Sequence, residues 1–443
     1  MSKAPTAPRP IAVPTARLTR LAGLGAMTAG VAGAMLRDGA GQWGRGQRPA
    51  MRDLLLTPAN ITRIADQLAK MRGAAMKIGQ MVSMDTGDVL PPELAQIMAR
   101  LRDSADTMPP AQLRKVLDAQ WPKGWLSQFR HFDVRPIASA SIGQVHRAQL
   151  RDGTDLAIKV QYPGVARSID SDVANVGALI RMTGLLPKGL DIAPYLTDAA
   201  RQLHEETDYA REAAQMTRYA ALIGDRPGFA IPQVRPDWST PQVLAMTYVA
   251  GQPIEAAVSE AQDVRDRIAR DLIALTLDEL WTFGVMQTDP NFANYRWQAD
   301  TGRVVLLDFG AAGDIDTTTA QHYRDLLRAG LADDMDAAMV MVERIGFIAP
   351  DAAVAHRAQI AVMMAQVFAR LRDPAGIDFA DTSLSRRLQA QGMQLAEDGF
   401  IPPPVPIAVL LVQRKLAGMF LLAARLGARV DVHGLLADHL GHA

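Results

Sequence analysis

Apolar residues at three- and four-residue spacing predict that helices make up most of this chain. The spacing is sustained over residues 57–120, where Thr57 followed by Pro58 is typical of a helix start. It returns over residues 165–223 and dominates again over residues 255–443. These three segments are therefore expected to be mainly helical.

Alternating apolar and polar residues predict a few short strands between the helical segments. Residues 129–163 alternate on either side of the turn-forming sequence Arg151-Asp152-Gly153. Two further strands are expected at residues 229–238 and 241–251. A last pair lies within residues 295–310, around an Asp-Thr-Gly turn.

These patterns together predict an α+β protein with two lobes and a helical extension. We expect an irregular leader at residues 1–50, the helical extension at 51–128, a small mixed lobe at 129–250 and a larger helical lobe at 251–443. Ligand sites favour junctions between such lobes, so the functional site is expected in the cleft between them.

Composition excludes several classes of function. The 443 residues carry no formal net charge, which argues against a nucleic-acid-binding protein. The chain has no cysteine, so disulfides, thiolate nucleophiles and cysteine-based zinc sites are excluded. Only eight of its 47 basic residues are lysines, a bias typical of a GC-rich bacterial genome. In such a chain a lysine can mark a position that needs a compact point charge.

Two apolar segments raise the question of membrane contact, although neither has the roughly twenty uninterrupted apolar residues of a membrane span. Residues 21–36 are rich in Ala and Gly and lie between two arginines. They are compatible with a disordered or weakly helical leader, a membrane-surface helix or a signal peptide. Residues 405–427 are interrupted by Gln413, Arg414 and Lys415, which favours a buried helix over a membrane-associated one.

Three oxygen-bearing side chains near the last strand pair suggest a magnesium–nucleotide site. Asn294 follows Asp289 by five residues, and Asp308 follows Asp289 by nineteen, directly before Phe-Gly. Protein kinases place a catalytic Asp, a metal-binding Asn and a metal-binding Asp in this order. The alternative is structural, with Asp289 starting a turn before Pro290 and Asn294 capping a strand.

Phosphate-binding features are expected in the small lobe. Lys159 lies on an apolar strand, as the phosphate-binding lysine of a kinase does, although it could be a surface lysine. The preceding loop, Ala138-Ser139-Ala140-Ser141, occupies the place where a kinase has glycines. Its methyl groups are expected to restrict the loop and alter the grip on nucleotide, unless it is an ordinary turn.

An acidic stretch at residues 204–214 lies on a helical pattern. On an unbroken helix, Glu206 and Glu212 would lie about 120° apart, whereas Asp208 and Glu212 would share a face. Two acidic faces suggest two cationic partners, and the candidates are Lys159 and Lys77. The alternative is a solvated run of charges.

With these residues assembled, the chain resembles the UbiB/AarF family of atypical kinases, and most closely its coenzyme Q-supporting branch. The resemblance runs from about Asp53 to at least Arg328. Its most specific motifs are RGAAMKIGQMVS (72–83), ASASIGQVH (138–146), IKVQYPGVARSIDSDV (158–173), ETDYAREA (206–213), MQTDPNFAN (286–294) and LLDFGA (306–311).

The resemblance implies a protein-kinase-like fold and a role for each motif. Lys77 and Gln80 would lie over the cleft, Glu206 and Asp208 would meet the helical extension, and Glu212 would pair with Lys159. Asp289 would be the catalytic Asp, and Asn294 and Asp308 would bind magnesium. Residues 247–251, with Tyr248 and Val249, would offer backbone groups to adenine. The Gln-Thr-Asp-Pro-Asn sequence and the serines of the 138–141 loop depart from the pattern of many relatives.

We therefore expect an ATP-binding, magnesium-dependent atypical kinase or ATPase that supports ubiquinone biosynthesis, with ATP or ADP and Mg²⁺ as cofactors. The alternatives are a nucleotide-gated scaffold, or pseudokinase, that organises lipid-synthesis enzymes, and a small-molecule phosphotransferase. Expected partners are a nucleotide, a lipid or quinone precursor, coenzyme Q biosynthetic enzymes and a peripheral membrane surface, with no nucleic acid. The expected location is the bacterial cytoplasm, with membrane association as a further option.

Overall fold

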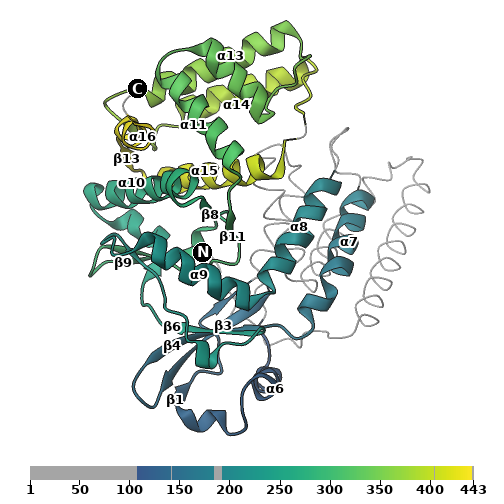
Figure 1. Cartoon of the computed structure of the whole chain (residues 1–443), viewed down its shortest axis with the longest axis vertical. Helices are drawn as coiled ribbons and strands as arrows, with labels where there is room; N and C mark the ends of the chain where they lie inside the picture. The colour runs from purple at the N-terminus through teal and green to yellow at the C-terminus, as the bar shows by residue number, and fades with distance from the viewer. Residues whose placement is uncertain (1–106, 141, 184–191, 404, 442–443) are drawn as a thin grey trace, which may run out of the picture. The chain divides into compact units, whose positions relative to one another are not determined.

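The structure is a computed structural model that describes residues 107–140, 142–183, 192–403 and 405–441. Predictions that fall on residues 1–106, including those for Lys77 and Gln80, lie outside the described residues, as does Ser141. The chain divides into two compact units. Of the described residues, the first unit takes those up to Ala214 together with Gln233–Tyr248, and the second takes Gln215–Pro232 and those from Val249 onward. Figure 1 labels many of the elements.

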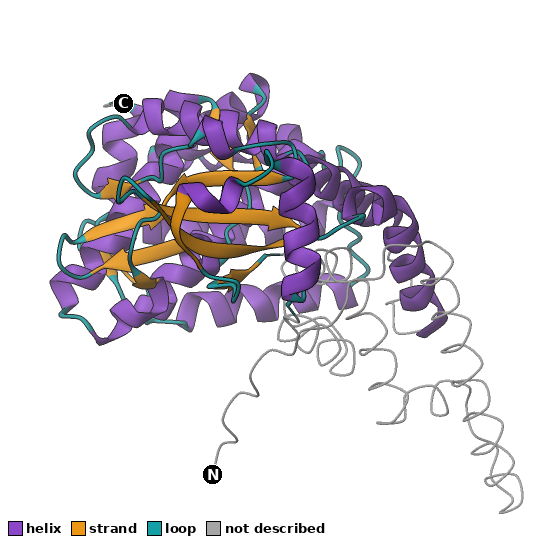
Figure 2. Ribbon diagram, turned by 90° about the horizontal axis from the view of Figure 1, so that it is seen from below, coloured by secondary structure: helices purple, strands orange, loops and turns teal. Residues whose placement is uncertain are grey.

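The first unit contains an antiparallel sheet with the strand order β1-β3-β4-β6, in which β2 also pairs with β3. The alternating pattern and the turn at residues 151–153 are confirmed, because β3 and β4 pair along their length around that turn. The strands are drawn in orange in Figure 2. Their bounds are Phe129–Phe132 (β1), Ala138–Ser139 (β2), Gly143–Leu150 (β3), Asp155–Gln161 (β4) and Val243–Thr247 (β6).

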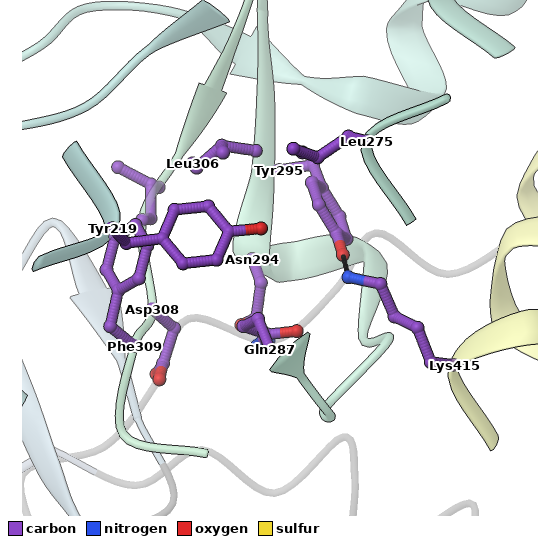
Figure 3. A pocket seen from close by; sticks show the side chains of 10 residues that line it. Tyr219, Leu275, Gln287, Asn294, Tyr295, Leu306, Asp308, Phe309 and Lys415 are labelled. Carbon is purple, nitrogen blue, oxygen red and sulfur yellow. Dashed lines mark hydrogen bonds between the residues drawn. The ribbon is translucent and has the colours of Figure 1, made fainter. Parts of the chain in front are cut away.

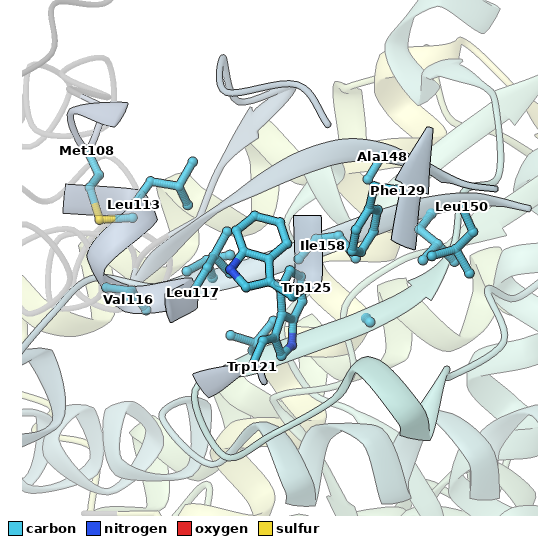
Figure 4. Close-up of a cluster of buried hydrophobic side chains, with 14 of the residues drawn as sticks. Met108, Leu113, Val116, Leu117, Trp121, Trp125, Phe129, Ala148, Leu150 and Ile158 are labelled. Carbon is cyan, nitrogen blue, oxygen red and sulfur yellow. The ribbon is translucent and has the colours of Figure 1, made fainter. Parts of the chain in front are cut away.

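An aromatic cluster joins this sheet to helix α6 (Pro110–Gln120), the described end of the predicted extension. Trp121, directly after α6, stacks on Phe129 of β1 with ring centroids 5.6 Å apart, and its centroid lies 4.9 Å from that of Trp125. Buried leucines and a valine of α6 complete the cluster (Figure 4). Large rings contribute much of the buried apolar area in such a core, so α6 is held to the sheet by this cluster.

Three helices follow β4 in the sequence: α7 (Val165–Thr183), α8 (Ala193–Glu206) and α9 (Tyr209–Ile223). The expectation of one unbroken helix through the acidic stretch is wrong, because α8 ends at Glu206 and α9 starts at Tyr209. Asp208 lies in the break, where its Oδ1 accepts a hydrogen bond from the Arg211 backbone N–H at 3.0 Å. Short acidic side chains are favoured at this position because their oxygen accepts a hydrogen bond from a backbone N–H group at the start of the helix. Asp208 is exposed and Glu212 is buried, so the two do not share a face.

The second unit contains a four-stranded sheet with the order β5-β10-β9-β7. The strand pair predicted around the Asp-Thr-Gly turn is confirmed by β9 (Tyr295–Gln298) and β10 (Arg303–Leu306), and the turn uses a positive φ of 67° at Gly302. The prediction of a strand over residues 229–238 is mostly wrong, because only Phe229–Ala230 forms a strand, β5. Two prolines in that segment lack the N–H groups that a longer strand needs. The remaining strands are β7 (Gln252–Pro253), β8 (Val285–Gln287), β11 (Ala312–Asp314), β12 (Ile377–Asp378) and β13 (Arg429–Val430).

Helices make up the rest of the second unit, as predicted. A π-helical turn at Glu279–Phe283 directly follows the first of these helices, which ends at Asp278. The helices are α10 (Gln262–Asp278), α11 (Thr317–Leu331), α12 (Met335–Ile345), α13 (Val354–Leu371), α14 (Ser383–Glu397), α15 (Ile407–Leu426) and α16 (Val432–Leu440).

Helix α15 contains the second apolar segment singled out in the sequence. Among the described residues, it is the one helix whose length and composition would allow it to cross a membrane. It packs against α10, and nine of its residues are buried, including Arg414 and Lys415. One face of α15 therefore belongs to the core of the second unit, whereas Ile407, Phe420 and Leu421 are exposed.

Candidate functional site

Lys159 and Glu212 form the ion pair that the resemblance implies. Lys159 Nζ on β4 lies 2.7 Å and 2.9 Å from the two carboxylate oxygens of Glu212 on α9. The side chains are only 9% and 1% exposed. The Lys159 amine also lies 5.2 Å from the centre of the Tyr209 ring. A buried pair of this kind fixes the direction of the lysine side chain, because neither charge can be left alone in a dry environment.

The segment predicted to be a phosphate-covering loop is a tight hairpin. Ala138 and Ser139 belong to β2 and pair with β3, so the expectation that they are loop residues is wrong. The Ala140 N–H donates to the Gly143 carbonyl at 2.8 Å and closes the turn. A Cβ at Gly143 would lie 2.5 Å from the Val160 carbonyl oxygen, so only glycine lets β3 approach β4 this closely.

A series of buried hydrogen bonds passes through two side chains of β3, and sequence reasoning missed it. The Met108 N–H donates to Gln144 Oε1 at 2.7 Å, and Gln144 Nε2 donates to His146 Nε2 at 2.8 Å. His146 Nδ1 then donates to the Asp133 carbonyl at 2.7 Å. Burial lowers the pKa of His146 to about 4, against smaller opposing effects of Asp133. The sequence signal was that Gln144 and His146 are two residues apart and therefore lie on the same face of a predicted strand.

The segment expected to meet adenine lies where the two units divide. Tyr248 is the last residue of the first unit, and Val249 is in the second. The Tyr248 N–H donates to the Asp155 carbonyl at 2.9 Å, and the Arg147 guanidinium lies 4.4 Å from the centre of the Tyr248 ring. Because the Tyr248 N–H already has a partner, any contact of its backbone with adenine is restricted to its carbonyl.

Asp289 and Asn294 are joined within one short loop of the second unit. The loop leaves β8, and Thr288 anchors it by donating its hydroxyl to the Ala311 carbonyl at 2.9 Å. The Asn291 side chain accepts from the Ala293 N–H at 3.1 Å and starts a 3₁₀ turn, which ends at Asn294. Asn294 Nδ2 donates to the Asp289 carbonyl at 3.1 Å. This bond fixes the amide plane and leaves its oxygen directed away from the Asp289 carbonyl.

Asp308 lies next to Asn294 after the adjoining strand ends. Its Oδ1 accepts from the Gly310 N–H at 2.9 Å, and the Leu307 N–H donates to the Asn294 carbonyl at 3.0 Å. The side chains of Asn294 and Asp308 line the same small pocket, which has room for about one water molecule (Figure 3). A carboxylate and an amide oxygen are hard ligands of the kind that Mg²⁺ prefers, so this pair of residues fits the ion. The other residues that line the pocket are Lys415, Gln287 and apolar or aromatic side chains.

A buried polar cluster forms part of the wall of this pocket, and sequence reasoning also missed it. Four of its members line the pocket: Tyr219, Gln287, Tyr295 and Lys415. Glu279 accepts hydrogen bonds from the Tyr219 hydroxyl and from the Gln287 N–H, the latter at 3.0 Å. Lys415 Nζ lies 3.1 Å from Glu279 Oε2. It also lies 3.2 Å from the Tyr295 hydroxyl, a contact drawn as a dashed line in Figure 3. The available signal was Lys415 itself, one of the eight lysines and placed in an apolar segment.

Residues 100–342 match the description of an ABC1 atypical kinase-like domain. The chain belongs to this family. The match covers more than half of the chain and includes the Lys159–Glu212 pair and the loop of Asp289 and Asn294. It confirms the resemblance drawn from the sequence motifs.

Relatives of known name extend the similarity along almost the whole chain. The mitochondrial atypical kinase COQ8 of Saccharomyces cerevisiae is 36% identical over 96% of this chain and 85% of its own length. The mitochondrial atypical kinase COQ8B of Rattus norvegicus is 37% identical over 96% of this chain and 81% of its own length. Among solved structures, a complex of Rv3197 from Mycobacterium tuberculosis with erythromycin has a TM-score of 0.60. It is 25% identical and covers 84% of this chain and 93% of that one. The α+β, kinase-like fold is thereby confirmed.

Proposed function

We propose that this family member is an ATP-binding, magnesium-dependent atypical kinase or ATPase that supports ubiquinone biosynthesis. The observation that carries the proposal is that Asn294 and Asp308 line one pocket, at the end of the loop that carries Asp289. The similarity to proteins named atypical kinase COQ8 supports the same class of activity. The link to ubiquinone rests on the resemblance to the coenzyme Q-supporting branch.

In this proposal each polar residue of the kinase motifs has one role. Asn294 and Asp308 hold Mg²⁺, which neutralises charge on the phosphates of ATP or ADP. Lys159 binds the α- and β-phosphates, and its ion pair with Glu212 keeps the amine in place. Asp289 orients the acceptor and takes its proton, whether the acceptor is water or a hydroxyl compound.

The remaining sequence candidates form the nucleotide-covering and regulatory parts of the proposed site. The segment of residues 138–141 covers the phosphates, and Tyr248 and Val249 contact adenine through their backbone. Lys77 and Gln80 act together with Glu206 and Asp208 as the family regulatory motif. Asp208 combines this role with its hydrogen bond to the Arg211 N–H.

Phosphate release separates this proposal from its alternatives. We expect the wild-type protein to release phosphate from ATP only with Mg²⁺, and Asp289→Asn to abolish release. Asp314→Asn, at an exposed carboxylate paired with Arg218, is the matched control and is expected to retain it. Nucleotide binding without release, with and without liposomes, would favour the nucleotide-gated scaffold. Release that requires a soluble hydroxyl compound would favour a small-molecule phosphotransferase.

We further propose partners and a location that follow from the coenzyme Q branch. The partners are a lipid or quinone precursor, coenzyme Q biosynthetic enzymes and a peripheral membrane surface, and the location is the bacterial cytoplasm next to a membrane. The two relatives named above are mitochondrial proteins. Flotation of the full chain with liposomes, compared with a chain lacking residues 1–50, tests whether the leader supplies membrane contact.

A further inference from the structure

One buried ion pair holds both ends of the loop that carries Asp289 and Asn294. At the start of the loop, the Gln287 N–H donates to Glu279 Oε1 at 3.0 Å. At its end, the Tyr295 hydroxyl lies 3.2 Å from Lys415 Nζ. Glu279 and Lys415 are themselves 3.1 Å apart and are 0% and 2% exposed. The loop is therefore fixed at both ends to a single pair of charges.

Helix α15 contacts the middle of the same loop through a glycine. Gly418 lies three residues after Lys415, so the two positions share a face of the helix. A Cβ at position 418 would overlap the Cβ and Cγ atoms of Pro290, which directly follows Asp289. Glycine in a helix interior costs about 1 kcal/mol relative to alanine. Glycine at position 418 is explained by Pro290, which occupies the space that a side chain there would need.

Lys415 keeps its positive charge in the folded protein. Burial lowers the pKa of Lys415, but the neighbouring Glu279 and Tyr295 outweigh this effect and raise it to about 12. Burial, with Glu279 as a further cause, also raises the pKa of Tyr219 well above its usual value, so its hydroxyl keeps the proton that it donates. A buried ion pair adds little net stability compared with apolar side chains of the same size. Its charge-assisted bonds do, however, fix geometry.

We propose that helix α15 positions the metal-binding loop, with Lys415 and Gly418 as positioning residues that set the placement of Asp289 and Asn294 relative to Asp308. This inference rests on the proposed magnesium–nucleotide function. It assigns a role to a helix that lies outside residues 100–342, the part that matches the family domain. Both are positioning residues because they contact the loop, Lys415 through Tyr295 and Gly418 through Pro290.

A matched pair of helix glycines provides the first test. Gly418→Ala adds a methyl group against Pro290, whereas Gly392→Ala adds one on α14 where nothing lies within 4 Å. Both changes raise helix propensity equally. We expect Gly418→Ala to raise the Mg²⁺ concentration for half-maximal nucleotide turnover by about 10- to 100-fold, as do losses of groups that orient metal ligands. We expect Gly392→Ala to leave it unchanged.

A double substitution tests the ion pair without leaving a buried charge alone. Lys415→Met combined with Glu279→Gln removes both charges but keeps a side-chain oxygen for the Gln287 N–H and the Tyr219 hydroxyl. We expect this protein to keep its thermal midpoint and to show the same weakened Mg²⁺ dependence as Gly418→Ala. A purely structural role for the pair predicts the reverse, with a lower midpoint and unchanged Mg²⁺ dependence, and that result would overturn the inference.

Hydrogen exchange in the nucleotide-free protein makes the inference testable apart from the proposed function. We expect amide exchange of a peptide covering residues 287–295 to become several-fold faster in Gly418→Ala than in Gly392→Ala. Equal exchange in the two variants, together with equal Mg²⁺ dependence, would reject the positioning role. If the wild-type protein fails to bind nucleotide while exchange still differs, the proposed function fails and the positioning role of α15 stands.

Discussion

His146 provides a quantitative test of the buried network in the first unit. Its ring accepts a hydrogen bond from Gln144 and donates one to the Asp133 carbonyl, an arrangement that only the neutral ring can satisfy. Protonation would set a second donor against the Gln144 NH₂ group. It would thereby disturb the bond that Gln144 accepts from the Met108 N–H. The perturbation is His146→Gln, which removes the titrating ring.

The size and sign of the effect follow from the pKa of His146, which burial lowers from 6.5 to about 4. Between these values the unfolded chain binds a proton that the folded protein does not, so the free energy of unfolding falls as the pH falls from 6.5 to 4. The slope is about 1.4 kcal/mol per pH unit, and the total loss is on the order of 3 kcal/mol. The free energy of unfolding of His146→Gln is not expected to fall in this way between pH 6.5 and 4.

Urea denaturation between pH 7.5 and 4 measures the effect through tryptophan fluorescence, since Trp121, Trp125 and Trp238 lie in the first unit's aromatic cluster. The wild-type protein should exceed His146→Gln in stability at pH 7.5, and the difference should shrink towards pH 4. His131→Gln, which removes a ring exposed on β1, should retain the wild-type acid response. If wild type and His146→Gln lose stability equally with acid, the argument is refuted.

Three further predictions concern the first unit. Ala140→Gly should relax the hairpin and change the affinity for ATP relative to ADP, and identical thermal-shift profiles with the two nucleotides would reject this. Glu212→Gln should lower the free energy of unfolding by roughly 3 kcal/mol in urea titrations, because Lys159 loses its buried carboxylate partner. The double variant Lys159→Met with Glu212→Leu should recover stability but not nucleotide binding. A stable but inactive Glu212→Gln protein would contradict the first part. Gly143→Ala should destabilise the sheet through its clash with the Val160 carbonyl, and an unchanged thermal midpoint would show that the strands can separate at no cost.

The parts of the fold that sequence predicted best depend on local patterns. Alternation and a turn sequence located β3 and β4, and an Asp-Thr-Gly turn located β9 and β10. Both signals depend on neighbouring residues, whose geometry the backbone dictates. The spacing of Asp289, Asn294 and Asp308 was informative for the same reason, because two short loops at the ends of adjoining strands carry all three.

The errors arose where one residue competes with a continuing pattern. Helical spacing runs through Thr207 and Asp208, but the Asp208 side chain binds the Arg211 N–H and starts a new helix. The prolines at 232 and 236 end a strand that alternation favoured. In each case a local hydrogen bond, or the lack of a donor, outweighed the hydrophobic period.

Long-range polar contacts could not be predicted from one sequence. Glu279 and Lys415 are separated by 136 residues, and no local pattern specifies that they meet. The contact between Gly418 and Pro290 is of the same kind, since it depends on how α15 packs. Lys415 was noted in the sequence only as one of three polar residues that interrupt an apolar segment, and the scarcity of lysine in this chain was a signal that was not applied to Lys415.

Calorimetric titration of ATP into the protein, with and without Mg²⁺, tests the central claim most directly. The wild-type protein should bind ATP more tightly with Mg²⁺, and Asp308→Asn should abolish that dependence, because one of the two metal ligands is lost. Asp314→Asn should bind as the wild-type protein does. Mg²⁺-dependent binding that is unchanged in Asp308→Asn would contradict the assignment of Asn294 and Asp308 as the metal-binding pair.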